Sequence, residues 1–183
     1  MKGKARARAV FLDRDGVLND VVYRAGRAES PRSPAEFRIN PDAAAACARL
    51  KDAGFLIVVA TNQPDVARGQ VTPEVLHELH DILRRAVSVD DIVVCPHDDA
   101  DGCECRKPLP GLLVEAAHRW GADLGASFFI GDRWRDVDAG KAAGCTAIFL
   151  DRGDESEKTP EGADLRFHGL LEAAEWILST AAQ

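Results

Sequence analysis

Apolar runs of strand length alternate with helical patterns along this chain, and this alternation most constrains its fold. The apolar runs lie at residues 7–13, 55–61, 91–95, 127–132 and 146–151, and the helical patterns at 41–54, 72–87, 109–121, 135–144 and about 168–180. The runs lack the polar alternation of a half-exposed strand, so helices should cover both sheet faces. The pattern predicts a doubly wound, Rossmann-like α/β fold, a three-layer α/β/α sandwich with a mostly parallel sheet.

Length limits the domain organisation. The chain has 183 residues, of which 46% are hydrophobic, which suits one core, so we expect a single domain over 1–183. The spacing between the strand-end motifs leaves no room for a separate lid domain. Three loops, at about 19–38, 63–71 and 96–105, should therefore shape the pocket of a capless protein. The polar stretch at 152–164 is predicted to be a mobile loop.

Charge and cysteine usage exclude several classes of partner. The net charge is −7 and the pI about 5.2, which argues against nucleic acid and anionic membranes as partners. No apolar run approaches the roughly 20 residues that span a bilayer, and the start of the chain lacks an export-signal pattern. The odd number of cysteines, five, favours free thiols or metal ligands over disulfides. We expect a cytoplasmic protein, monomeric by default, that acts on a small molecule.

Polar side chains follow four of the predicted strands. They are Asp13 and Asp15 after the first, Thr61, Asn62 and Gln63 after the second, Arg106 and Lys107 beyond the third, and Asp132 and Asp136 after the fourth. In a doubly wound sheet, ligands bind outside the carboxyl ends of the strands. These four segments should therefore converge on one rim.

The chemistry that fits this set is phosphoryl transfer. Crowded carboxylates repel each other unless a cation joins them, and a few hard oxygen ligands suit Mg²⁺. One carboxylate, Asp13, can then attack phosphorus to form an aspartyl-phosphate, while Asp15 serves as general acid and then as base. Lys107, Thr61 and Asn62 would stabilise the charge on the transferring group.

A second constellation lies in the stretch CPHDDADGCEC, at 95–105. Cys95, His97, Cys103 and Cys105 offer three thiolates and one imidazole within this loop. Four ligands complete a tetrahedral Zn²⁺ site, so this zinc would be structural, and it would hold Arg106 and Lys107 in place. Cys47 and Cys145 lie in helical and strand-edge patterns and are predicted to be buried thiols.

The motifs DRDGV, TNQ, RKP and GD with a further Asp, in this order, resemble the four motifs of the haloacid dehalogenase superfamily of phosphatases. The resemblance covers roughly residues 8–151. It implies that Asp13 is the nucleophile, Asp15 the acid/base, and Thr61 and Lys107 the phosphate ligands. It also implies that Mg²⁺ is held by the Asp13 side chain, the Asp15 backbone carbonyl and Asp132. Asp136 matches a second motif acid, which is often not a direct ligand.

The zinc loop followed by CRKP resembles the subgroup of D-glycero-D-manno-heptose 1,7-bisphosphate 7-phosphatases and histidinol-phosphatases. The segment TNQPDVARG is closer to the heptose enzymes, which implies a sugar bisphosphate as substrate. Asn19, Gln63, Arg106 and Arg133 match positions that contact the sugar or its phosphates in them. The loop after Asn19 departs from the usual pattern. Arginines crowd the pocket loops (Arg24, Arg27, Arg32, Arg38 and Arg68), and one or two of them could bind a second phosphate.

Four other functions stay open at this point. Histidinol-phosphate hydrolysis uses the same chemistry. So does hydrolysis of nucleotide-linked or other sugar phosphates, because single motifs do not encode the leaving group. A receiver-type signalling domain would also be phosphorylated on Asp, but an acid/base at Asp15 favours turnover over a lasting phospho-state. A zinc-bearing interaction module would leave the convergence of Asp13, Lys107 and Asp132 unexplained.

Overall fold

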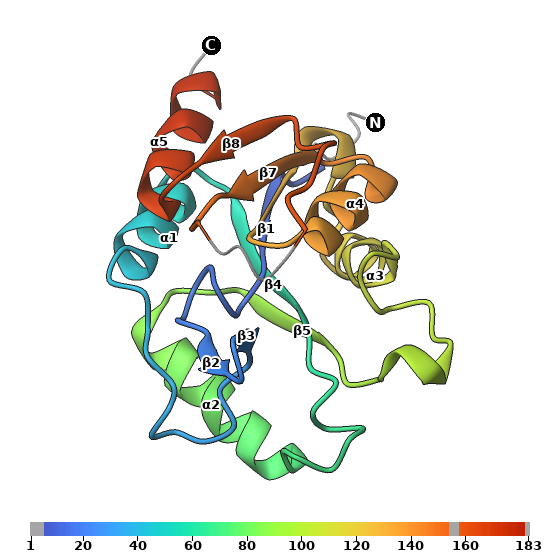
Figure 1. The fold of residues 1–183 in the computed structure, drawn as a ribbon. Helices are drawn as coiled ribbons and strands as arrows, with labels where there is room; N and C mark the ends of the chain where they lie inside the picture. Colours follow the sequence, from blue (N-terminus) through green and yellow to red (C-terminus); the bar gives the residue numbers. More distant parts are fainter. Residues whose placement is uncertain (1–5, 154–157, 182–183) are drawn as a thin grey trace.

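The computed structural model describes residues 6–153 and 158–181 and contains a six-stranded, fully parallel sheet (Figure 1). The strand order is β5-β4-β1-β6-β7-β8. The strands are β1 (Ala9–Leu12), β4 (Leu56–Asn62), β5 (Asp91–Cys95), β6 (Phe128–Gly131), β7 (Thr146–Leu150) and β8 (Leu165–Phe167). The predicted doubly wound α/β architecture is confirmed. Strand β8 was not predicted, because its three residues carry no apolar run.

Helices cover both faces of the sheet. They are α1 (Ala43–Asp52), α2 (Pro73–Ala86), α3 (Gly111–Trp120), α4 (Trp134–Ala143) and α5 (Leu170–Ala181). Residues of α1, α2 and α5 pack with Val10 and Leu12 in one core cluster, whereas residues of α3 and α4 pack with Ala9 and Phe11 in another. Neighbouring residues of β1 thus face opposite, equally buried cores, which explains the uninterrupted apolar runs.

The winding of the chain reverses between β1 and β6. The segments that follow β1 and β4 lead through α1 and α2 on one face, and β6 leads through α4 on the other. Adjacent strands whose connections leave toward opposite faces open a crevice at their carboxyl ends. Asp13 follows β1 at this crevice and Asp132 follows β6.

Loops and short elements lie at the carboxyl edge of the sheet. Within 19–38, β2 (Val22–Arg24) and β3 (Arg27–Glu29) form an antiparallel hairpin that was predicted only as loop. Its two turn residues, Ala25 and Gly26, both have positive φ, as a type I′ turn requires. Two 3₁₀ helices complete the described elements: η1 (Asp99–Asp101), in the loop after β5, and η2 (Leu124–Ala126), which precedes β6 at the opposite, amino edge of the sheet.

The connection after β7 was predicted to be mobile over 152–164. Residues 154–157 lie outside the described part, and residues 158–164 form neither helix nor strand. Among the helices of the described residues, none is long and apolar enough to cross a membrane.

Candidate active site

Asp13 and Asp15 leave β1 at the crevice, and both are nearly buried. The backbone N–H of Asp13 donates to the carbonyl of Ile130 at 2.9 Å, which extends the β1–β6 pairing to the predicted nucleophile. Gly16 then turns the chain with φ +84°, and a Cβ there would lie 1.8 Å from Oδ2 of Asp132. The glycine of DRDG therefore lets the first acidic motif approach the last.

Lys107 reaches into the same crevice from the far end of the zinc loop. Its Nζ lies 2.8 Å from Oδ1 of Asp13 and 2.6 Å from Oδ1 of Asp136, and it donates to the carbonyl of Ala60 at 2.9 Å. The side chain is buried. The predicted nucleophile and the predicted phosphate-binding cation are thus neighbours.

Three carboxylates, Asp13, Asp132 and Asp136, could hold a metal ion. Each offers an oxygen, and these oxygens lie within 4.8 Å of one another. Burial, with the neighbouring acids, raises the pKa of Asp13 to about 6 and the pKa of Asp132 well above its usual range. Oδ1 of Asp132 is buried without a hydrogen-bond partner among the described residues. Crowded, partly unpartnered hard oxygens are a donor set that fits Mg²⁺.

Asp136 is closer to the centre of the site than the sequence indicated. Its carboxylate is buried, pairs with Lys107 and accepts the backbone N–H of Arg133 at 3.0 Å. It also excludes a side chain at Gly131, where a Cβ would lie 2.1 Å from the Cβ of Asp136. The sequence signal was its place in the first turn of α4, four residues after Asp132.

The carboxylate of Asp15 accepts hydrogen bonds from four side chains. The partners are Arg14 (Nε and Nη2, both 3.0 Å), Asn19 (2.9 Å), Gln63 (2.8 Å) and Ser30 (2.8 Å). Burial acts to raise the pKa of Asp15, but Arg14 and the other donors outweigh burial and lower it. Arg14 and Ser30 were not predicted as site residues, because no motif marks them.

In the TNQ segment, Asn62 and Gln63 form hydrogen bonds mainly with other residues of the site. Asn62 donates to the carbonyl of Lys107 at 3.0 Å and accepts its N–H at 3.1 Å, which fixes that backbone. Gln63 donates to the Thr61 hydroxyl at 2.9 Å as well as to Asp15. Direct contacts of Asn62 and Gln63 with a substrate remain predictions.

The four predicted zinc ligands come together. Sγ of Cys95 lies 3.1 Å from that of Cys105 and 3.6 Å from that of Cys103, and Nδ1 of His97 lies 3.4 Å from Sγ of Cys105. A tetrahedron with Zn–S bonds of about 2.3 Å has edges of roughly 3.8 Å, so the cluster has the size of a zinc site. Cys47 and Cys145 lie elsewhere, as predicted, and burial raises the pKa of each to about 12.

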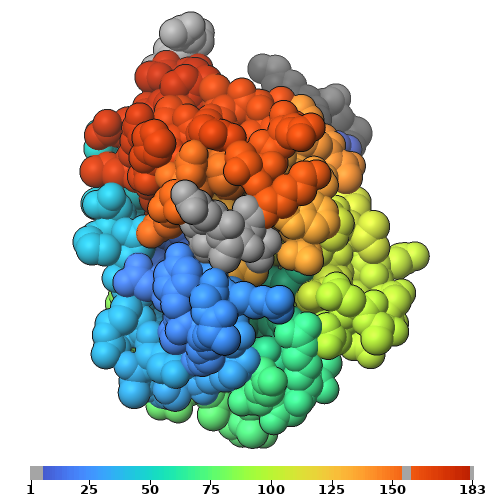
Figure 2. Space-filling view, in the orientation of Figure 1, coloured from blue at the N-terminus to red at the C-terminus, as the bar shows by residue number. Residues whose placement is uncertain are grey.

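A cavity of about 520 Å³ opens above Asp13 and Lys107. Residues of the hairpin, the 63–71 loop and the zinc loop line it, as predicted for a capless site. Six arginines are among them: Arg27, Arg32, Arg68, Arg106, Arg133 and Arg135. Arg24 and Arg38 do not line it. In the space-filling view, the blue segment that holds the hairpin lies at the surface near the yellow-green segment around residue 100 (Figure 2).

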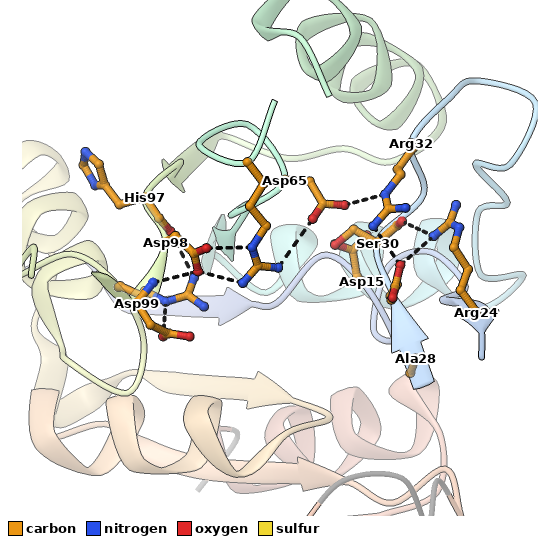
Figure 3. Close-up of polar contacts among 12 residues, drawn as sticks. Asp15, Arg24, Ala28, Ser30, Arg32, Asp65, His97, Asp98 and Asp99 are labelled. Carbon is orange, nitrogen blue, oxygen red and sulfur yellow. Dashed lines mark hydrogen bonds and ion pairs between the residues drawn. The ribbon is translucent and has the colours of Figure 1, made fainter. Parts of the chain in front are cut away.

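Ion pairs connect the three loops (Figure 3). Arg68 pairs with Asp98 of the zinc loop at 2.6 Å and with Asp65 at 3.6 Å, and Asp65 accepts from Arg32 at 2.7 Å. Arg32 also contacts Glu29 of β3 at 2.8 Å. Exposed pairs stabilise little one by one, but a network holds loops in register.

Two residues predicted to contact substrate are held by protein groups. Arg133 donates to the carbonyl of Ala28 at 2.9 Å, which ties α4 to the hairpin. Arg106 pairs with Asp99 at 2.7 Å and donates to the carbonyl of His97 at 3.1 Å. Both line the cavity.

The fold and site are those of an enzyme class that transfers phosphoryl groups at the switch point of a parallel sheet. A model of haloacid dehalogenase-like hydrolases matches residues 27–144, and the chain belongs to this family. Within the family it is a phosphatase, as its relatives indicate.

Relatives from several bacteria carry the name D-glycero-β-D-manno-heptose-1,7-bisphosphate 7-phosphatase. The one from Bordetella bronchiseptica is 37% identical and aligns with 84% of this chain and 86% of its own. The one from Pseudomonas aeruginosa is 36% identical over 92% and 97%. A crystal structure of the D,D-heptose 1,7-bisphosphate phosphatase from B. bronchiseptica, complexed with magnesium and phosphate, has a TM-score of 0.80 at 35% identity and covers 94% of this chain and 99% of that one.

Proposed function

We propose that this phosphatase hydrolyses the 7-phosphate of D-glycero-β-D-manno-heptose 1,7-bisphosphate, giving heptose 1-phosphate and inorganic phosphate in a Mg²⁺-dependent reaction. The observation that carries the chemistry is the contact of Lys107 with Asp13 beneath an arginine-lined cavity. The names of the relatives support the choice of sugar.

The reaction proceeds in two displacements. An Oδ of Asp13 attacks phosphorus, the bond from phosphorus to the sugar oxygen breaks, and Asp15 gives its proton to that oxygen. Water then attacks the aspartyl-phosphate and passes a proton to Asp15. The bond between phosphorus and Asp13 breaks, which releases phosphate and regenerates both carboxyl groups.

Groups from several segments at the carboxyl edge of the sheet would stabilise the negative charge of the phosphoryl group. Lys107 and the Thr61 hydroxyl would bind the equatorial phosphoryl oxygens, and Asn62 positions Lys107 through its backbone. Mg²⁺, held by the Asp13 side chain, the Asp15 carbonyl and Asp132, would offset the charge of the phosphoryl group and of the crowded acids. Asp136 completes this acidic set.

Zinc would have a structural role at Cys95, His97, Cys103 and Cys105. Four protein ligands leave no open position for substrate. The loop that these ligands close leads directly into Arg106 and Lys107, so zinc binding would order the phosphate site. The loop has few apolar residues of its own to stabilise it.

The second phosphate of the substrate would bind to arginines of the cavity wall. Arg27 lies on the hairpin and has no ion-pair partner among the described residues, which leaves its guanidinium for a ligand. Arg106 and Arg133 approach from other segments. Guanidinium groups bind phosphate oxygens in a bidentate manner.

We propose that the protein works in the cytoplasm. We also propose that the chain forms one domain and acts as a monomer. Support comes from the cysteines, none of which is in a disulfide.

The test is phosphate release by purified protein with Mg²⁺ on the α and β anomers of heptose 1,7-bisphosphate and on histidinol phosphate. ³¹P NMR would show which phosphate leaves. We expect rapid loss of the 7-phosphate from the β anomer and no turnover by Asp13→Asn. Turnover of histidinol phosphate alone would support the phosphatase mechanism and contradict the heptose bisphosphate as the substrate. A stable phospho-aspartate without turnover would refute the enzyme in favour of a receiver-type domain.

A further inference from the structure

Arg14 lies between the two acids of the first motif, but its side chain points away from the cavity into the core. It is the largest fully buried side chain of the described residues and does not line the cavity. Its guanidinium binds both oxygens of Asp15, through Nε and Nη2 at 3.0 Å each. A buried guanidinium is costly unless all its donors are used, so its remaining partner is informative.

That partner is His80 of α2. Nη1 of Arg14 lies 3.1 Å from Nε2 of His80. Because a guanidinium only donates hydrogen bonds, Nε2 must present its lone pair, and the imidazole is neutral with its proton on Nδ1. Burial, with the charge of Arg14, lowers the pKa of His80 to about 3, which agrees with this assignment. The ring of Phe37 lies 5.5 Å from the guanidinium carbon and covers it.

His80 itself is held firmly. Leu76, Leu79 and Leu83, on the same face of α2, are buried, and Leu79 and Leu83 belong to the main core cluster.

The hydrogen-bond partners of Asp15 lie on two different sides of its carboxylate. Ser30, the residue after β3, donates to Asp15 and lines the cavity where a substrate would bind. Arg14 contacts Asp15 from the core side, and His80 contacts Arg14. A bound substrate can change the contacts on the cavity side but cannot reach those on the core side.

We propose that Arg14 and His80 are positioning residues that hold the Asp15 carboxyl group against the leaving oxygen, with His80 acting only through Arg14. This inference rests on the proposed function, in which Asp15 is the acid and base. It assigns a part in turnover to a helix residue outside the four motifs. Proton transfer depends strongly on placement, so we expect loss of His80 to lower kcat and leave KM nearly unchanged.

Three substitutions separate positioning from packing. His80→Gln puts an amide oxygen near the place of Nε2 and can still accept from Arg14. His80→Asn puts its oxygen near the place of Nδ1 and falls short. His80→Leu removes the acceptor. Exposed His77, one turn earlier on α2, serves as the control position through His77→Leu. Urea unfolding of each variant would establish that it is folded.

The substrates are the heptose bisphosphate, whose alcohol leaving group needs a proton, and 4-nitrophenyl phosphate, whose phenolate does not. We expect His80→Asn and His80→Leu to lower kcat on the sugar by about tenfold or more, with KM within about twofold. Phosphoenzyme formation from 4-nitrophenyl phosphate, followed as a burst of nitrophenol, should stay within about twofold of wild type, and His80→Gln should retain kcat on the sugar within about threefold.

Two results would overturn the inference while leaving the proposed function intact. In one, folded His80→Asn retains wild-type kcat on the sugar. In the other, the burst falls as much as kcat and His80→Gln rescues nothing, as expected for a purely structural residue. Wild-type protein inactive on both esters would refute the proposed function and this inference together.

Discussion

The ammonium group of Lys107 lies 2.8 Å from Oδ1 of Asp13, although one residue follows the zinc loop and the other follows the first strand of the sheet. Burial acts to lower the pKa of Lys107, but Asp13 and Asp136 outweigh burial and raise it. The same cation counteracts the effect of burial on the pKa of Asp13. Lys107 therefore helps to keep Asp13, the proposed nucleophile, as a carboxylate in a site that otherwise favours its protonation.

Replacing Lys107 should remove both phosphate binding and this counter-charge. We expect Lys107→Met to lower kcat on the sugar bisphosphate by about 10²- to 10³-fold, as for loss of one well-placed group at an oxyanion. Lys141→Met, which removes an exposed lysine paired with Asp164, is the matched control and should have no effect. A kcat within about tenfold of wild type would show that Lys107 has no part in charge stabilisation.

Gly16 allows the first and last acidic motifs to meet. Gly16→Ala would put Cβ 1.8 Å from Oδ2 of Asp132 at φ +84°, so we expect loss of Mg²⁺ binding and of activity. Gly54→Ala is a matched control, because Gly54 has φ +85° with nothing within 4 Å of its Cβ. The control should lose about 1 kcal/mol of stability through backbone strain and remain active. Calorimetric titration with Mg²⁺ would measure the affinity of both variants. Equal Mg²⁺ affinity of Gly16→Ala and Gly54→Ala would contradict the predicted loss of Mg²⁺ binding.

Zinc should order the loop that carries Arg106 and Lys107. We expect Cys105→Ser to reduce zinc from about one ion per chain to a small fraction of that and to lower kcat about tenfold or more. Cys145→Ala, which alters a buried thiol outside the cluster, should retain zinc. Metal content by mass spectrometry and kcat on the same samples provide the check. A zinc-free variant with wild-type kcat would rule out the ordering role.

His80 should make the protein sensitive to acid. Its pKa is about 3 when folded, and an unfolded histidine titrates near 6.5, so between these values the unfolded state binds more protons. Stability therefore falls as pH decreases below about 6.5, by roughly 2 kcal/mol between pH 6.5 and 5.

Urea unfolding at pH 7 and pH 5 would measure this loss, and His80→Gln should reduce it. Arg14, Arg84, Asp15 and His77 are the charged or titratable groups that act on His80. All of them remain in this variant. An equal loss of stability in wild type and His80→Gln would assign the acid sensitivity to other groups.

Metal-free protein should carry unfavourable repulsion among its acids. Because burial, Asp13 and Asp136 all raise the pKa of Asp132, Asp132→Asn should increase the free energy of unfolding without Mg²⁺. The same substitution should abolish the rise in Tm that Mg²⁺ produces in wild type. Thermal unfolding with and without Mg²⁺ tests both, and an unchanged Mg²⁺-dependent rise would exclude Asp132 as a ligand.

Much of the fold was predictable because apolar periodicity is a local property of the chain. The five buried strands of the core and all five helices follow from it. The hairpin and β8 could not be predicted, since strands of three residues carry too short a pattern. Their pairing depends on neighbours distant in sequence or on a turn whose positive φ values are unusual for Ala25.

The sequence by itself determined the doubly wound sheet, the acids at its edge and a loop with four zinc-type ligands, because strand periodicity and motif chemistry are written in neighbouring residues. Only the tertiary structure decided that Asp136 belongs to the acidic centre, that Ser30, just after the hairpin, binds Asp15 and that His80 holds Arg14. These contacts join segments far apart along the chain, and polar side chains acquire their partners only when packing brings such segments together.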